Sequence, residues 1–297
     1  MQPSTSFNIP TLALIGPGLI GGSLAAALKS AGVVQQVLGV GRDANSLRQA
    51  QDLGLIDRPV SVAEAAAQAD VLVLATPVRA SAALFSEMYP HLQPDAVITD
   101  VGSTKADVVG LAKERLQEHF MRFVPGHPIA GAEKTGPEAA RADLYQDRNV
   151  VLTPTADTCP LAQQTVTQMW LHCGARVLLM EPAEHDEVLA SVSHVPHFLS
   201  AVFMWQVASA ENADLRLNLA GSGFRDFTRI AAGSAEVWRD IFLSNKQAVL
   251  QELREVRNAF AQAEQALLES DEASLYDFLE RAALARRLWA SRSGYHE

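Results

Sequence analysis

The chain has 297 residues, of which 48% are hydrophobic and 20% charged, the balance of an ordinary globular protein long enough for two domains. Its net charge of −10, with no offsetting cluster of Lys or Arg, argues against nucleic acid or an anionic membrane as a partner. No basic residue precedes Lys29 and no long uninterrupted apolar run occurs, so we expect no signal peptide, no membrane span and a cytoplasmic location.

The first predicted strand ends in a glycine-rich turn that opens a helix. Residues 12–15 form a short apolar run that suits a buried strand, and helical spacing begins after the turn. Gly16 permits the tight turn, Gly18 lets a pyrophosphate approach the backbone, and Gly21 lets helix and strand pack closely. The free amides at the helix N-terminus then face the phosphates. We therefore predict a nicotinamide or flavin nucleotide site at Gly16-Pro17-Gly18-Leu19-Ile20-Gly21.

Strand and helix patterns then alternate as far as residue 180, which is typical of a parallel sheet. Ser61 and Glu64 have the spacing of a capping box at the start of a helix. Cys159 and Cys173 flank another predicted helix; two cysteines are too few for a disulfide framework, so we expect reduced, partly buried thiols. Further strands are predicted at 36–40, 71–75, 97–100, 123–126, 149–153 and 176–180.

The character of the sequence changes near Glu181-Pro182, after which only helical periodicity is found. Residues 185–210 are compatible with one long helix, although Pro196 removes one of its hydrogen bonds and favours a kink. A glycine loop at 221–223 separates this helix from residues 224–229.

Residues 245–269 and 274–289 have the pattern of two closing amphipathic helices. A helical region this rich in Ala and Leu is expected to bury part of its apolar surface against a second copy. We therefore predict an α/β fold in which a Rossmann-type dinucleotide-binding domain, residues 8–181, is followed by an all-helical dimerisation domain, residues 182–297.

Ligands of open α/β sheets bind beyond the carboxyl ends of the strands, where three segments fall: Thr76-Pro77, residues 100–105 and residues 126–131. His127 directly follows a short strand, so we expect its imidazole to point into the crevice. Histidine titrates near neutral pH and suits proton removal from a hydroxyl during hydride transfer. The alternative is a turn histidine that bonds only the backbone.

Two further histidines, His194 and His197, are three residues apart and share a helix face beside Pro196. The proline favours a pocket there over two solvated histidines. Together with His127 they could hold a metal ion, but the spacing is not HExxH and nearby Cys or carboxylate ligands do not complete a set. We therefore predict no metal site.

Arg225 and Arg229 are four residues apart and share one face of a short helix. Two guanidinium groups on one face suit a dicarboxylate, and a surface pair bridging acidic neighbours is the alternative. We interpret His185 and Asp186 as structural residues in the charged first turn of a helix.

Six segments, in order from residue 12 to about residue 250, resemble the family of prephenate and arogenate dehydrogenases of tyrosine biosynthesis. They are GPGLIGGS, ATPV, DVGSTK, GHPIAGAEKTG, SHVPHFLS and GFRDFTRIAAGSAEVWRDIF. The combination of HPIAG with the later SHxPH and FRDFTRIA is highly specific. The resemblance implies a nucleotide-binding domain joined to a helical domain that forms a homodimer.

The reaction that the resemblance implies is oxidative decarboxylation of a cyclohexadienol by NAD or NADP. By motif position, His127 matches the histidine that bonds the 4-hydroxyl and helps remove its proton. Ser103 matches a residue near both the nicotinamide and that hydroxyl, and Arg229 matches the arginine that holds a substrate carboxylate. The remaining substrate-pocket matches are His197, Trp238 and, more loosely, His194 and Arg225.

Two departures bear on specificity. NAD-using members carry an acidic residue at the end of the second strand, where this chain has Gly41 followed by Arg42 and Asp43. A missing carboxylate followed by arginine favours NADP, while Asp43 leaves NAD use open. Ala132 stands where some members have threonine before the glutamate. The sequence does not decide between prephenate and arogenate, and tyrosine is kept as a candidate inhibitor.

Two other functions fit the same two-domain pattern. A hydroxyacid dehydrogenase or imine reductase would use a lysine of the helical domain, where this chain offers only Lys246. A non-catalytic nucleotide sensor would need neither His127 nor the arginine pair. We expect no mutase domain before the nucleotide site and no regulatory domain after Trp289.

Overall fold

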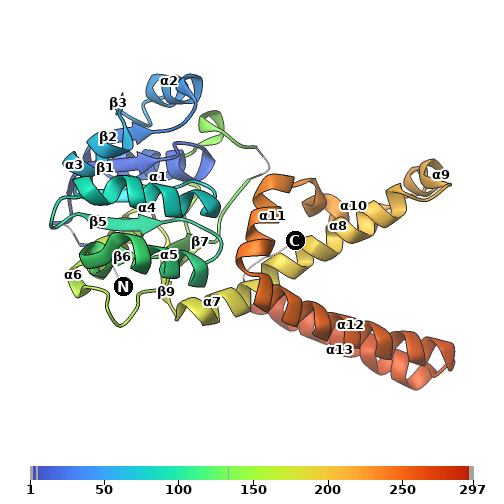
Figure 1. The fold of residues 1–297 in the computed structure, drawn as a ribbon. Helices are drawn as coiled ribbons and strands as arrows, with labels where there is room; N and C mark the ends of the chain where they lie inside the picture. The colour runs from blue at the N-terminus through green and yellow to red at the C-terminus, as the bar shows by residue number, and fades with distance from the viewer. Residues whose placement is uncertain (1–2, 5, 133, 294–297) are drawn as a thin grey trace. The chain divides into compact units, whose positions relative to one another are not determined.

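The computed structural model describes residues 3–4, 6–132 and 134–293, so the glutamate after Ala132 lies outside the described residues (Figure 1). A six-stranded parallel sheet is its centre, with strand order β3-β2-β1-β4-β5-β6. This order reverses direction at β1 and β4, the arrangement that leaves a ligand crevice beyond the strand ends. The strands are β1 (Ile9–Ile15), β2 (Val34–Val40), β3 (Arg58–Pro59), β4 (Val71–Leu74), β5 (Val97–Asp100) and β6 (Phe123–Val124).

Helices cover both faces of this sheet because alternate residues of each strand point to opposite sides. Leu12 and Leu14 of β1 belong to one buried cluster, with α1 and α6, whereas Ala13 and Ile15 belong to another, with α3, α4 and α5. Ser61 caps α3 as predicted, its side chain accepting the main-chain N–H of Glu64. These helices are α1 (Leu19–Ser30), α2 (Ala44–Asp52), α3 (Val62–Gln68), α4 (Ser81–Met88), α5 (Ala106–Leu116) and α6 (Pro160–His172).

The last predicted strands do not extend the parallel sheet. The strand expected at 123–126 is split by Pro125 into β6 and β7 (Gly126–Pro128), because proline has no N–H for a ladder and usually ends a strand's pairing. β7 pairs antiparallel with β8 (Asn149–Leu152), which pairs parallel with β9 (Arg176–Leu179), in a separate three-stranded sheet. His127 therefore lies within a paired strand rather than in a loop after one.

The helical region begins at Pro182, where the sequence changes character. The long helix expected at 185–210 is one continuous segment, made of α7 (Pro182–Leu189), a π-helical turn (Ala190–His194) and α8 (Val195–Ala208). By length and composition alone the stretch Pro182–Ala208, with a mean hydropathy of 1.3, also fits a membrane span, and one such helix is weak evidence for a membrane. Here it buries His185, Asp186 and His194, a polar set that belongs in a protein interior.

The remaining helices include two that the sequence analysis did not predict, α9 (Ala213–Asn218) and α11 (Ala235–Ser244). α10 (Ser222–Thr228) runs into a 3-10 turn (Arg229–Ala232). Residues up to Lys246 form one compact unit, and residues from Gln247 form a second, built from most of α12 (Lys246–Leu268) and from α13 (Glu272–Ser293). These two helices match the closing pair that was predicted.

The glycine-rich turn provides a test of close packing. Gly16 has φ +97°, and a Cβ there would lie 2.4 Å from the Ala75 carbonyl oxygen, whereas Gly32 has φ +68° with nothing within 4 Å of a Cβ. Both Gly→Ala changes carry backbone strain of about 1–3 kcal/mol, and only Gly16→Ala adds an overpacking cost of about 1–3 kcal/mol. Gly16→Ala should therefore melt several degrees below Gly32→Ala in a thermal scan. Equal melting temperatures would show that the turn relaxes freely.

Candidate active site

The turn between β1 and α1 has the features that a pyrophosphate needs. A Cβ on Gly21 would lie 2.4 Å from the Gly16 carbonyl oxygen, so helix and strand approach as closely as predicted, whereas Gly18 faces open space. α1 begins after Gly18 with no side chain capping its first amides. The hydroxyl of Thr76, at the end of β4, is buried without a hydrogen-bond partner among the described residues. These donors fit a dinucleotide, with Leu19 and Ile20 in the first turn of the helix and Pro77 beside Thr76.

At the end of β2 the three predicted residues have separate environments. Gly41 and Arg42 are exposed, and no ion pair of Arg42 is found within the described residues. Asp43 caps α2, where its carboxylate accepts the N–H and the hydroxyl of Ser46 at 2.8 and 2.6 Å. The hydrogen bond from the Ser46 side chain lowers the pKa of Asp43. Asp43 is thus already engaged in its own helix.

The loop after β5 is anchored by a buried ion pair. The ammonium of Lys105, fully buried, donates to the carboxylate of Asp100 and to the Gly126 carbonyl oxygen, the latter at 2.8 Å. Asp100 also accepts the Gly126 N–H at 3.1 Å. Burial lowers the pKa of Lys105, and the nearby Asp100 opposes that shift. Both main-chain groups of Gly126, the residue before His127, are therefore held by this pair.

His127 lies at the carboxyl edge of the sheet with its ring against the start of α7. Its Nδ1 is 2.9 Å from Nε2 of His185, and Nδ1 of His185 is 2.8 Å from a carboxylate oxygen of Asp186. The same carboxylate accepts the N–H groups of Lys105 and Ala106 at 2.8 and 2.9 Å. Burial, followed by electrostatic interaction with the His185 ring and the Lys105 ammonium, lowers the pKa of His127 well below its usual range. His127 is therefore unprotonated at neutral pH.

The interpretation of His185 and Asp186 as a merely charged helix turn is wrong, because both are buried and bonded to the site. Asn245, at the end of α11, was also missed; its amide donates to the Asp186 carbonyl oxygen at 2.6 Å and lies 3.1 Å from Nδ1 of His194. No local spacing announces these contacts, which join positions 51 to 59 residues apart. In α7 the pair stands between two further charged residues, Glu184 and Glu187, so the local sequence does not distinguish it from a solvated turn.

The other predicted pocket residues gather around Trp238. His197 stacks on the Trp238 ring at a centroid distance of 3.6 Å, and His194 meets it edge-on at 6.4 Å. Burial lowers the pKa of His197, and the positive charge of Arg229 lowers it further, which puts Arg229 near this cluster. Ser103 is half-buried in the loop after β5, with its main chain close to His194.

Arg225 and Arg229 are both exposed, but they belong to different elements. Arg225 lies in α10, and Arg229 caps the end of that helix with helical dihedral angles and begins the following 3-10 turn, so their sharing of one face stays a prediction. No contact with the histidine cluster is found for Arg225 among the described residues. Nor do these residues contain a group of three or more His, Cys, Asp or Glu side chains placed to hold a metal ion.

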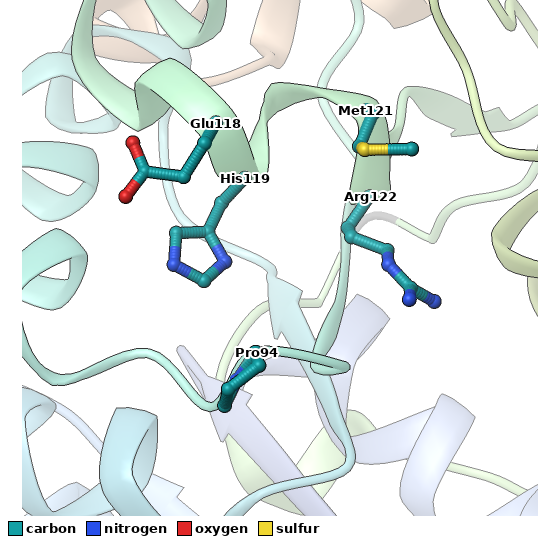
Figure 2. Close-up of a pocket in the computed structure, with 5 residues that line it drawn as sticks. All are labelled: Pro94, Glu118, His119, Met121 and Arg122. Carbon is teal, nitrogen blue, oxygen red and sulfur yellow. The ribbon is translucent and has the colours of Figure 1, made fainter.

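A separate pocket lies at the opposite edge of the sheet (Figure 2). Pro94, Glu118, His119, Met121 and Arg122 line it. Pro94 precedes β5 and Arg122 precedes β6, so this pocket is at the amino ends of the strands. None of its residues was predicted for the site, and ligands of such sheets bind at the carboxyl edge.

Comparison with known proteins identifies two matching domain families. The prephenate dehydrogenase nucleotide-binding domain matches residues 24–179, and the prephenate dehydrogenase dimerization domain matches residues 181–281. Cyclohexadienyl dehydrogenase of Zymomonas mobilis is 35% identical over 260 residues, covering 84% of this chain and 88% of the relative. Prephenate dehydrogenase of Bacillus subtilis is 37% identical over 243 residues, covering 81% of this chain and 65% of the relative.

Solved structures of the same family are also similar to this chain. Prephenate dehydrogenase from Aquifex aeolicus, in complex with hydroxyphenyl propionate and NAD+, superposes with a TM-score of 0.89 at 32% identity, covering 95% of this chain and 99% of that one. Arogenate dehydrogenase from Synechocystis superposes with a TM-score of 0.81 at 29% identity, covering 94% and 99%. Both the sheet region and the helical region of this chain therefore have counterparts of known structure.

The buried histidines make stability depend on pH. Burial lowers the pKa of His194 to about 4, whereas an unfolded histidine titrates near 6.5. Between these values the unfolded state binds more protons, so stability falls as pH falls, by about 2 kcal/mol for this group at pH 5. The melting temperature should therefore drop less between pH 7 and pH 5 in His194→Asn than in the wild type. The exposed His91→Asn should follow the wild type, and equal drops in all three proteins would contradict the assignment.

Proposed function

Because this chain belongs to the prephenate dehydrogenase family, we propose that it catalyses the NAD(P)-dependent oxidative decarboxylation of prephenate, arogenate or both, in tyrosine biosynthesis. The reaction removes hydride from the ring carbon that bears the 4-hydroxyl, removes the hydroxyl proton, and releases the ring carboxylate as carbon dioxide. Membership of this family favours that reaction over the hydroxyacid, imine and sensor alternatives.

The observation that carries the proposal is the state of His127. It is buried at the carboxyl edge of the sheet, and burial lowers the pKa of its ring, which favours the neutral imidazole. A neutral imidazole whose Nδ1 is bonded to His185 has Nε2 left to accept the hydroxyl proton. When bound, the nicotinamide accepts the hydride, and aromatisation of the ring drives loss of carbon dioxide. His127 thus serves as the general base, with Ser103 proposed beside the same hydroxyl.

We assign substrate binding to the cluster around Trp238. The stacked pair of His197 and Trp238 offers a flat surface to a six-membered ring, and Arg229 next to it suits a carboxylate. His194 is proposed as a further pocket residue. Arg225 is the weaker candidate, because the electrostatic interaction with His197 is found for Arg229 and not for Arg225 among the described residues. Tyrosine, the product or product relative, is proposed as an inhibitor of the same pocket.

Residues 8–181 are proposed as the part that binds the dinucleotide, and residues 182–297 as the part that binds substrate and forms a homodimer in the cytoplasm. The family supports NAD(P) use. We propose a preference for NADP, because Gly41 supplies no carboxylate and Asp43 is committed to capping α2. The guanidinium of Arg42, at the end of β2, is then the group that would bind the 2′-phosphate of NADP.

The cofactor assignment is tested by steady-state assays at 340 nm with prephenate and arogenate, each with NAD and NADP. We expect turnover of at least one substrate and NADP use at least as good as NAD use. Arg42→Ala should raise KM for NADP about tenfold or more, since a charge-assisted contact contributes roughly 1.5–3 kcal/mol, and should leave NAD unchanged. Arg48→Ala, another arginine of the same segment, is the control. A strong NAD preference that Arg42→Ala does not alter would overturn the NADP assignment, and no turnover of either substrate would overturn the function.

Substitutions of His127 and Arg229 should affect different kinetic parameters, kcat for His127 and KM for Arg229. His127→Asn keeps a polar group near His185 but has no base for the proton, so kcat should fall by about 10² to 10⁴ with little change in KM. Arg229→Ala loses a carboxylate contact of roughly 1.5–3 kcal/mol, so KM for the substrate should rise about 10- to 150-fold. Measuring kcat, KM and melting temperature separates these effects.

Two exposed residues serve as controls for that pair, His91→Asn and Arg216→Ala, and both should behave as the wild type. The assignment fails if His127→Asn keeps most of its kcat. It also fails for Arg229 if the substitution lowers the melting temperature while KM stays the same, which would indicate a structural ion pair.

The homodimer is proposed to form through the helical region, which exposes large apolar side chains in one chain. Phe203 and Trp205 of α8 and Leu215 of α9 are 42%, 71% and 59% exposed. Light scattering should give twice the chain mass of 32.0 kDa, and Trp205→Glu should shift the protein toward the single-chain mass. Leu161→Glu, a 61% exposed leucine of α6, should leave the dimer intact. A monomer at micromolar concentration in the wild type would refute this proposal.

A further inference from the structure

Behind the proposed base lies a buried chain of three polar side chains that ends on a carboxylate. The contacts run from His127 to His185 at 2.9 Å and from His185 to Asp186 at 2.8 Å. His185 is 0% exposed and Asp186 5%, so water does not replace these bonds. Buried polar groups are costly unless each donor meets an acceptor, and this requirement fixes where the protons are.

The proton positions follow from Asp186. Each of its carboxylate oxygens already accepts a main-chain N–H, from Lys105 or Ala106, and a carboxylate can only accept. Nδ1 of His185 must therefore donate to Asp186. In the neutral form of His185, Nε2 is unprotonated and can only accept, so the proton between the two histidines then belongs to Nδ1 of His127.

We infer that His185 and Asp186 are positioning residues that hold His127 as the tautomer protonated on Nδ1, so that its bare Nε2 is available to the substrate hydroxyl. This inference rests on the proposed role of His127 as the base. When Nε2 takes the hydroxyl proton, Nδ1–H can pass to Nε2 of His185, which retains its own proton on Nδ1. The chain then holds one more proton, the one taken from the hydroxyl, and its positive charge lies on the His185 ring, whose Nδ1 is 2.8 Å from the Asp186 carboxylate.

A second set of hydrogen bonds begins at the main-chain carbonyl of Asp186 and favours the Nε2-protonated tautomer of His194. The Asp186 carbonyl oxygen can only accept, so the atom of Asn245 that faces it at 2.6 Å is the amide nitrogen. The second hydrogen of that nitrogen points to Nδ1 of His194, 3.1 Å away, which must then be unprotonated. The proton of neutral His194 is therefore on Nε2, a buried atom with no partner among the described residues. The site thus presents one bare nitrogen, on His127, and one N–H, on His194.

The first test reads the tautomer without any turnover. Long-range ¹H–¹⁵N spectra of the full-length protein, labelled in histidine, distinguish a protonated ring nitrogen from a bare one, and His127→Asn identifies the His127 signals. We expect Nδ1–H and bare Nε2 in the wild type. Asp186→Ala removes the only acceptor of His185 Nδ1–H among these contacts, so the proton of His185 should move to Nε2, donate to Nδ1 of His127 and leave His127 protonated on Nε2. Asp52→Ala, a change at an exposed aspartate, should give the wild-type spectrum.

The second test is kinetic. In a serine-protease triad, an Asp→Asn change behind the histidine lowers kcat by about 10⁴ through the wrong tautomer, and we expect a loss of about 10² to 10⁴ in Asp186→Ala with KM within about threefold. His185→Gln still offers an acceptor to Nδ1 of His127 and should lose about tenfold. His185→Leu, which removes the acceptor, should lose about 10² to 10³. If Asp186→Ala does not fold, the comparison of His185→Gln with His185→Leu tests the inference.

The inference is overturned if wild-type His127 is protonated on Nε2, or if His185→Leu and His185→Gln have equal kcat values in folded protein. Wild-type protein that shows the expected tautomer but turns over neither prephenate nor arogenate would instead remove the proposed function and leave the tautomer assignment standing. The spectra and the assays therefore report separate failures.

Discussion

The carboxylate of Asp186 is the contact on which the site depends. It comes from α7 but caps α5, where it accepts the N–H groups of Lys105 and Ala106, and α5 has no capping side chain of its own. A carboxylate at a helix N-terminus is favoured both by the hydrogen bonds and by the helix dipole. One side chain therefore ties the start of the helical region to the sheet domain and, through its neighbour His185, sets the ring of His127.

The buried charged residues at this edge of the sheet hold other groups of the site in place. Lys105 is completely buried, and its partner Asp100 also bonds the main chain of Gly126. Replacing such a pair by apolar residues is often neutral or stabilising, whereas removing one partner costs about 3–5 kcal/mol. The pair is therefore weak evidence for a stabilising role. Its clear effect is to fix the main chain of Gly126, which both partners bond. The pair holds the residue before His127 while Asp186 holds the ring behind it.

Local chemistry made much of the nucleotide half predictable. The apolar run ending at Gly16 and the helical spacing after Gly21 specify strand, turn and helix within about twenty residues, and the structure shows that turn with the expected close contacts. Ser61 likewise caps its helix by accepting the Glu64 N–H, while the Glu64 carboxylate bonds Arg58 and Gln68, so only this half of the predicted capping box is observed. The change of pattern at Pro182 and the two closing helices also follow from short-range periodicity, because neighbours in sequence set the helical repeat.

From the sequence alone follow most strands of the parallel sheet, the glycine turn, the two closing helices and the residue types that the chemistry needs, but not α9, α11 or the break between β6 and β7. Only the tertiary structure decided that β7 leaves the parallel sheet, that Asp43 is engaged by its own helix, and that His185 stands behind His127. The reason is physical: periodicity records interactions within a few residues, whereas His127 and His185 are 58 positions apart and meet only when two separate elements pack. Proton placement follows from which acceptors that packing brings together, and no pattern along the chain encodes it.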